Sequence, residues 1–283
     1  MMREAILDVR VEAAEPQAFQ VVERSDYHRP PDHREDLIFS TWWLAFSILW
    51  DRTIEVSLLK RAIEDAGHGA RMVDVGCGDM TLFARGFLNL PAHYLGVEPN
   101  QRLLTKAKRQ FPNASLISSG GTSLHVGSDQ ADLVLCLWVL HISDEIPSLL
   151  KECGRIGRRG SKLIITIPDL NSELYSEVHR LTGRMFPESQ ISSPNAVLGE
   201  QHGLLFNELA GCDYKITRFS GSVSLPREPA NRIMPLIDFA QWLLPSGLQL
   251  NPLLQRACAH VDDFADLPSV LQDKGLLIEA TLP

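Results

Sequence analysis

The sequence has few cysteines, and none of them stands in a paired spacing. The 283 residues contain five cysteines, which are scattered and include no Cys-x-x-Cys motif. This pattern argues against a disulfide framework and against a structural zinc site. We therefore expect reduced thiols in a cytoplasmic protein without a metal centre.

Positive charge is also scarce. The chain has 27 lysines and arginines against 35 acidic residues, a formal net charge of −8, which argues against a broad nucleic-acid-binding surface. Residues 37–50 carry no charge, but a helix of that length is only about 21 Å long, too short to cross a bilayer. Residues 1–15 lack the apolar core of a signal peptide. We expect no nucleic-acid partner, no membrane span and no secretory signal.

What the chain does contain is a glycine turn after a short apolar segment. Residues 72–75 read Met-Val-Asp-Val, as in a short buried strand, and Gly76-Cys77-Gly78 follows directly. Glycines permit a tight turn and let a ligand approach the backbone closely. A helix is expected next, with Asp79 or Thr81 as its N-cap, which would leave N–H groups pointing at the turn. This is the geometry of a nucleotide-type site.

The turn differs from a dinucleotide-binding fingerprint. Thr81 stands three residues after Gly78, where that fingerprint has its third glycine. Asp79 follows Gly78 directly, and its carboxylate would repel a pyrophosphate but suit a cationic ligand. Residues 93–97 predict a second strand that ends in Glu98, where an acid can chelate ribose hydroxyls. A nicotinamide-dependent oxidoreductase remains an alternative.

These residues resemble the class I S-adenosylmethionine-dependent methyltransferases. Asp74 within its apolar run and the Gly76-Cys77-Gly78 turn match the family's first motif, and Glu98 matches the acid that ends its second strand. The resemblance extends at motif level through Pro168. It implies S-adenosyl-L-methionine as cofactor, with Glu98 on the ribose and Asp74 or Asp79 at the amino-acid end.

The stretch after the third expected strand departs from the family pattern. These enzymes commonly place an acid there that meets the adenine amino group, whereas this chain has Ser119-Gly120-Gly121. The adenine contacts are therefore expected from the backbone at Gly121 and Thr122 or from a serine hydroxyl. The resemblance also implies that Tyr27 covers the methionine end of the cofactor.

Two acid–base candidates follow the later strands. Residues 132–137 are apolar after the first residue, as in a buried parallel strand, and the resemblance places Leu137 beside the cofactor. The next residues resemble the family's Val-Leu-His-His-Leu segment and include His141, which can accept a proton near neutral pH or simply bond backbone. Asp169, after the strand expected at 162–167, is a candidate for orienting substrate.

Strands and helices alternate along the chain, which predicts a doubly wound α/β sheet with its ligand crevice at the carboxyl ends of the strands. The resemblance implies a Rossmann-like, mostly parallel sheet of seven strands, the last antiparallel. Residues 1–66 are expected to form an N-terminal arm and apolar helical cap. Residues 67–283 are expected to form the methyltransferase domain, with insertions at about 170–202 and 228–272. The remaining elements are expected as helices at 51–66, 99–110, 146–156, 172–182, 206–211 and 233–244 and strands at 114–118, 213–219 and 276–281.

The function implied is methyl transfer from S-adenosylmethionine. The chain has no Asn-Pro-Pro-Tyr-like tetrapeptide of amino-methylating nucleic-acid enzymes, and its acidity and apolar caps favour a small, partly apolar metabolite, methylated at oxygen. Four aromatic residues share one face of the expected helix at 37–50, which could pack on the core, contact substrate or form a homodimer surface. A cofactor-binding protein without methyl transfer remains a second alternative.

Overall fold

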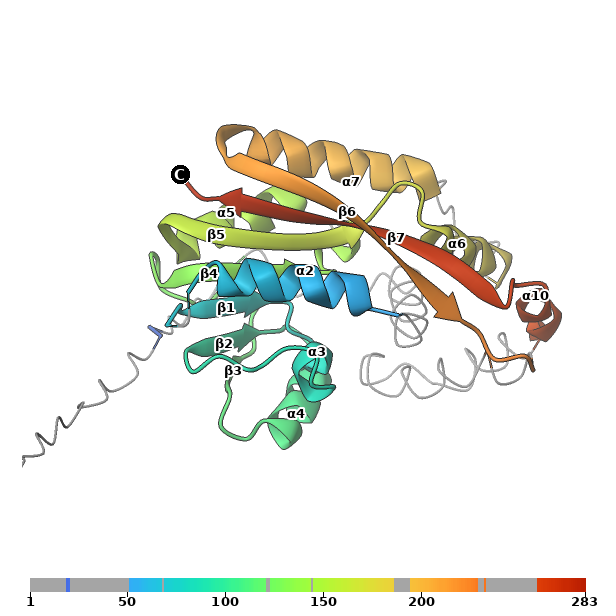
Figure 1. Cartoon of the computed structure of the whole chain (residues 1–283), viewed down its shortest axis with the longest axis horizontal. Helices are drawn as coiled ribbons and strands as arrows, with labels where there is room; N and C mark the ends of the chain where they lie inside the picture. Colours follow the sequence, from blue (N-terminus) through green and yellow to red (C-terminus); the bar gives the residue numbers. More distant parts are fainter. Residues whose placement is uncertain are drawn as a thin grey trace, which may run out of the picture.

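The computed structural model describes residues 19–20, 51–67, 69–120, 123–143, 145–185, 194–228, 232 and 259–283. Within these residues, seven strands form one sheet in the order β3-β2-β1-β4-β5-β7-β6 (Figure 1). The strands are β1 Met72–Val75, β2 Tyr94–Val97, β3 Ser115–Ile117, β4 Ala131–Leu137, β5 Gly157–Pro168, β6 Asp213–Ser224 and β7 Val270–Thr281.

The pairing within the sheet is mostly parallel. β3, β2, β1, β4 and β5 pair in parallel with their neighbours, whereas β7 runs antiparallel to both β5 and β6. The carboxyl ends of the parallel strands therefore meet along one edge. This confirms the predicted doubly wound, seven-stranded sheet with an antiparallel last strand.

Helices cover both faces of this sheet, as α2 in front of the strands and α5 behind β5 show in Figure 1. One apolar cluster joins the sheet to α2, α3, α4, α6 and α10, and a second joins its other face to α5 and α7. β4 serves both clusters, because Leu133 and Leu135 face the first while Val134 and Cys136 face the second. The helices are α2 Thr53–Glu64, α3 Thr81–Ala84, α4 Gln101–Gln110, η1 Leu140–Ile142, α5 Ile146–Ile156, α6 Glu173–Met185, α7 Pro194–Glu208, η2 Leu209–Gly211 and α10 Val261–Ala265.

The connection after β5 differs from the expected polar lid with a short helix at 206–211. The structure places α7 from Pro194 to Glu208, with η2 directly after it. Gly199 and Gly203 lower the helix propensity of this segment, but a Cβ at either position would meet nothing within 4 Å. Leu198 is buried in the first apolar cluster and Leu205 in the second. Burial of these side chains outweighs the propensity cost.

Three strands are longer than the sequence predicts. β5 begins at Gly157 rather than 162, because Gly157 already pairs with Ala131 of β4. β6 and β7 pair without interruption from Asp213↔Thr281 to Ser224↔Val270, so β7 begins inside the expected insertion at 228–272. Two charged residues and a glycine at 273–275 interrupt the apolar pattern, so the sequence does not predict this part of β7.

Several sequence expectations fall outside the described residues. These are the helices at 37–50 and 233–244, Tyr27, Gly121 and Thr122. Among the helices that the structure describes, none has the length and hydrophobicity that a membrane crossing requires.

Candidate functional site

The glycine turn leaves β1 at the carboxyl edge of the sheet. Gly76 has a φ of 76°, and its N–H donates to the Val97 carbonyl oxygen at 2.7 Å, which fixes the turn to the end of β2. A Cβ at Gly76 would lie 2.3 Å from Val139 Cγ2. Gly78 has a φ of 56° and opens onto free space, since a Cβ there would meet nothing within 4 Å. The turn thus presents bare backbone to a ligand.

The helix after the turn begins differently from the expectation. α3 has only four residues, and neither Asp79 nor Thr81 caps it through a side chain. Its N-cap residue is Met80, buried and held in the left-handed region at φ 59°, a conformation that costs about 1–2 kcal/mol for a residue with a Cβ. Asp79 instead accepts hydrogen bonds from the Thr81 hydroxyl and from Lys106 Nζ, the latter at 2.5 Å.

Lys106 is a residue that sequence reasoning missed at this site. It lies on α4 and forms an ion pair with Asp79 across 27 positions of the chain. The positive charge of Lys106 compensates the Asp79 carboxylate, which we expected from the sequence to face a cationic ligand. α4 carries several basic residues, and nothing in their spacing indicates which one would reach Asp79.

Glu98 lies directly beside the glycine turn. The N–H of Gly78 donates to Glu98 Oε2 at 3.1 Å, and the N–H of Asn100 donates to Oε1 at 2.9 Å. Burial raises the pKa of Glu98 to about 7, against the lowering effect of these two hydrogen bonds, and the charges of Asp74 and Asp79 raise it further. The structure therefore brings together the two predicted motifs, the turn and the acid after β2.

Asp74 lies buried below the same turn. The hydroxyl of Tyr94 donates to Asp74 Oδ2 at 2.9 Å. Burial raises the pKa of Asp74 to about 6, partly offset by this hydrogen bond. Tyr94 is a second residue that the sequence did not single out, although it begins β2 twenty residues after Asp74. The site thus contains two carboxyl groups that titrate near neutrality.

The end of β4 carries Leu137 and Trp138 to the same edge of the sheet. Leu137 is half-buried in the first apolar cluster. Trp138 has a φ of 59°, and its indole N–H donates to Glu55 Oε1 at 2.6 Å. Glu55 is buried, and this burial raises its pKa, while Arg52 and the indole lower it. A charged residue of α2 therefore anchors an aromatic residue of the ligand edge.

Replacing Trp138 by phenylalanine is expected to lower the free energy of unfolding by about 1–3 kcal/mol, because Glu55 would lose its indole donor while staying buried. Urea denaturation measures this change. A double-mutant cycle with Glu55→Leu, which removes the acceptor oxygen, separates the hydrogen bond from the lost packing. If Trp138→Phe lowered the free energy of unfolding equally with and without the Glu55 carboxylate, the predicted contribution of the hydrogen bond would be wrong.

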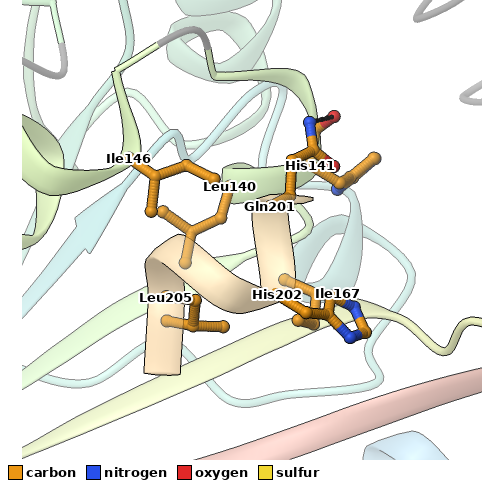
Figure 2. Close-up of a pocket in the computed structure, with 7 residues that line it drawn as sticks. All are labelled: Leu140, His141, Ile146, Ile167, Gln201, His202 and Leu205. Atoms are coloured by element: carbon orange, nitrogen blue, oxygen red, sulfur yellow. Dashed lines mark hydrogen bonds between the residues drawn. The ribbon is translucent and has the colours of Figure 1, made fainter. Parts of the chain in front are cut away.

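His141 lies in η1 and is buried. Burial lowers the pKa of His141 to about 3, so the imidazole is neutral at physiological pH. Its ring makes edge contacts with the rings of Trp138 and Tyr175, at centroid distances of 6.1 and 6.4 Å. The Gln201 side chain donates to the His141 carbonyl oxygen at 2.9 Å (Figure 2).

Figure 2 shows how α7 covers η1 on the other side. The hollow between them is too small for a water molecule. His202 donates through Nε2 to the Pro168 carbonyl oxygen at 2.9 Å, and burial lowers its pKa. The hollow is lined by Leu140, His141, Ile146, Ile167, Gln201, His202 and Leu205. This contact therefore holds η1 in place rather than admitting a ligand.

Asp169 follows β5 at the same edge, but its oxygens are already engaged. Oδ1 accepts from the backbone and side-chain nitrogens of Asn171 at 2.9 and 3.1 Å, and Oδ2 accepts from Arg218 Nε at 3.2 Å. Burial acts to raise the pKa of Asp169, but these partners outweigh it and hold the pKa below its ordinary value. The geometry gives Asp169 a role in shaping the turn after β5.

Comparison with known proteins agrees with this geometry. Residues 73–165 match the family model of a methyltransferase domain, a stretch that includes the glycine turn, Glu98 and His141. No curated protein matches the sequence. A presumed methyltransferase from Bacillus halodurans has a TM-score of 0.51 at 10% identity, and the match covers 80% of this chain and 99% of that one. The fold is therefore shared despite the low identity.

Two other solved structures are similar at a lower level. A SAM-dependent methyltransferase from Thermotoga maritima is 15% identical with a TM-score of 0.46, over 88% of this chain and 94% of that one. A geranyl diphosphate C-methyltransferase from Streptomyces coelicolor, solved with Mg²⁺, geranyl diphosphate and S-adenosyl-L-homocysteine, is 11% identical with a TM-score of 0.45, over 82% and 77%. Because the matched stretch carries the glycine turn and Glu98, and the sheet has the shared fold, we conclude that the chain carries a methyltransferase domain over residues 73–165.

Proposed function

We propose that this protein transfers the methyl group of S-adenosylmethionine to a small, partly apolar acceptor, with oxygen as the receiving atom. The observation that carries the proposal is Glu98, which is buried beside the bare backbone of Gly78 and accepts hydrogen bonds from Gly78 and Asn100. The acidic charge of the chain supports a small acceptor over nucleic acid.

The described residues fit the cofactor chemically. Glu98 would accept hydrogen bonds from the ribose hydroxyls, and Gly76 and Gly78 would allow the close approach of the ligand. Asp74 or Asp79 would meet the ammonium group of the methionine portion. Leu137 would line the site, and Tyr27, Gly121 and Thr122 complete the proposed cofactor-binding set.

The bound cofactor supplies an electrophilic methyl group, so the protein needs mainly to align the acceptor with it. Proximity and orientation lower such barriers by roughly 7–11 kcal/mol in well-aligned systems. His141 is the proposed proton acceptor. Its imidazole is neutral because burial lowers its pKa to about 3, and the proposed role requires the bound acceptor to raise this pKa toward neutrality. Asp169 would orient substrate by fixing the turn after β5.

Incubation with methyl-labelled cofactor and fractionated host extract tests the reaction. We expect label in the small-molecule fraction and alkali-labile or ether-type products that indicate oxygen methylation. Label found only in RNA or protein would contradict the proposed acceptor class. A folded, cofactor-binding protein that transfers no label to any fraction would support the alternative of binding without methyl transfer.

Cofactor affinity is expected to depend on pH through Glu98. Its pKa of about 7 lies above the ordinary value, so the carboxyl group holds a proton at pH 6 and is ionised at pH 8. Only the ionised form accepts hydrogen bonds on both oxygens. We expect S-adenosylmethionine to bind roughly tenfold more weakly at pH 6 than at pH 8, measured by calorimetric titration. Equal affinities at the two pH values would contradict this role of Glu98.

A further inference from the structure

Two further acids lie buried at the ligand edge, apart from the glycine turn. Glu55 is in the first turn of α2 and Asp273 is near the start of β7, and each side chain is about 1% exposed. Asp51 N–H donates to the Ser222 carbonyl oxygen at 2.8 Å, which brings the start of α2 to the end of β6. Figure 1 shows the first turn of α2, α6 and the start of β7 at the same end of the sheet.

One oxygen of Asp273 has no hydrogen-bond partner. Its Oδ1 accepts from the Ser172 hydroxyl and from the N–H of Lys274, the latter at 2.9 Å. Its Oδ2 is buried without any donor. A buried carboxylate oxygen without a partner is costly and uncommon in folded proteins. Such an oxygen indicates a position where a ligand supplies the missing donor.

Among the residues that the structure describes, the two acids have one cationic partner between them. Arg52 NH1 lies 3.3 Å from Glu55 Oε2, and it is the one cation that forms an ion pair with either acid among the described residues. Burial raises the pKa of Asp273 to about 6, the Ser172 and Lys274 hydrogen bonds lower it, and the Glu55 charge raises it further. Among the described residues, one guanidinium group therefore faces two carboxyl groups.

Aromatic rings stand next to Glu55. Trp138, whose indole donates to Glu55, makes edge contacts with the rings of Phe219 and His141, each at 6.1 Å. The His141 ring in turn makes an edge contact with the ring of Tyr175 in α6. Carboxylates combined with aromatic rings are the chemistry that binds an organic ammonium group.

We propose that Glu55 and Asp273 form a subsite for a protonated amine carried by the methyl acceptor. The inference rests on the proposed function, and it narrows the acceptor class to small aromatic or apolar amines. The ammonium group would donate to Asp273 Oδ2, which lacks a hydrogen-bond donor. Both carboxylates are covered in the structure, so the amine has to displace packed side chains, and the unpaired charge favours this displacement.

Three probes of similar shape test the subsite: benzylamine, benzyl alcohol and benzoate. Each is titrated calorimetrically at pH 7.5 into the full-length protein, with and without S-adenosyl-L-homocysteine. We expect benzylamine to bind at least tenfold more tightly than the other two probes. Asp273→Asn keeps Oδ1 as the acceptor for Ser172 but removes the charge, so it should abolish this preference.

Glu279→Gln is the matched control variant. Glu279 lies on the same strand and forms an ion pair with the exposed Lys215 at 3.4 Å, so this variant should keep the preference for benzylamine. Glu55→Gln provides a second test if Asp273→Asn does not fold, as judged by circular dichroism, and it should lower benzylamine affinity in the same direction.

The outcomes separate the subsite from the proposed function. A protein that binds S-adenosyl-L-homocysteine but shows no preference for benzylamine, or keeps the preference in Asp273→Asn, would overturn the subsite and leave the proposed function intact. A protein that prefers benzylamine through Asp273 but does not bind S-adenosyl-L-homocysteine would support the subsite and overturn the proposed function.

Discussion

Replacing Glu98 by glutamine is expected to weaken S-adenosylmethionine binding about a hundredfold or more. The proposed contacts are two hydrogen bonds from ribose hydroxyls to a carboxylate, and hydrogen bonds to charged groups contribute about 1.5–3 kcal/mol each. The backbone donors Gly78 and Asn100 hold the carboxylate in place for this role. Calorimetric titration at pH 8, where Glu98 is ionised, gives the largest difference between the two proteins.

Glu64→Gln is the control for this experiment, because Glu64 is exposed at the end of α2, away from the turn. It should bind the cofactor as the unmodified protein does. A Glu98→Gln protein that is folded and binds S-adenosylmethionine with unchanged affinity would remove Glu98 from the site.

The same variant also has an expected effect on stability. The raised pKa of Glu98 means that, between its ordinary value of 4.5 and about 7, the folded protein keeps a proton that the unfolded chain has released. Stability therefore falls as the pH rises through this window. Relative to Glu98→Gln, the unmodified protein without cofactor should lose stability between pH 5 and pH 8, which urea denaturation at both pH values measures.

The second large effect is expected for Gly76→Ala. An alanine Cβ would lie 2.3 Å from Val139 Cγ2, and the φ of 76° is unfavourable for any residue with a Cβ. Overpacking costs about 1–3 kcal/mol and the left-handed backbone about 1–2 kcal/mol. We expect the free energy of unfolding to fall by about 2–5 kcal/mol and cofactor binding to weaken strongly, because either the turn or the segment with Val139 must move.

Gly78→Ala is the matched control, since Gly78 also has a positive φ but a Cβ there would meet nothing within 4 Å. Its expected cost is only the backbone contribution of about 1–2 kcal/mol. Equal destabilisation of the two variants would show that the contact with Val139 does not set the requirement for glycine at position 76.

The sequence predicted the parts of the fold that depend on local pattern. The apolar residues at 72–75, the glycine turn and the strand ending in Glu98 all form as expected, and α5 occupies the predicted residues 146–156. In each case, the spacing of the apolar residues and the residues that favour turns predict the same structure. The juxtaposition of Gly78 and Glu98 follows from the parallel pairing of β1 and β2.

Features that depend on distant partners were not predictable in this way. Met80 adopts a left-handed backbone because its side chain is buried in the core, although its type disfavours that conformation. The pairing of Lys106 with Asp79 depends on how α4 docks, and the unpaired oxygen of Asp273 depends on the pairing of β7 with β6. None of these contacts leaves a periodic signal in the sequence.

Calorimetric titration of the unmodified protein with S-adenosylmethionine, beside a parallel titration with NAD, is the most direct test of the cofactor assignment. We predict saturable binding of one S-adenosylmethionine per chain at pH 8 and no binding of NAD, since Thr81 stands where the dinucleotide fingerprint has its third glycine. Binding of NAD without binding of S-adenosylmethionine would contradict the assignment of this site.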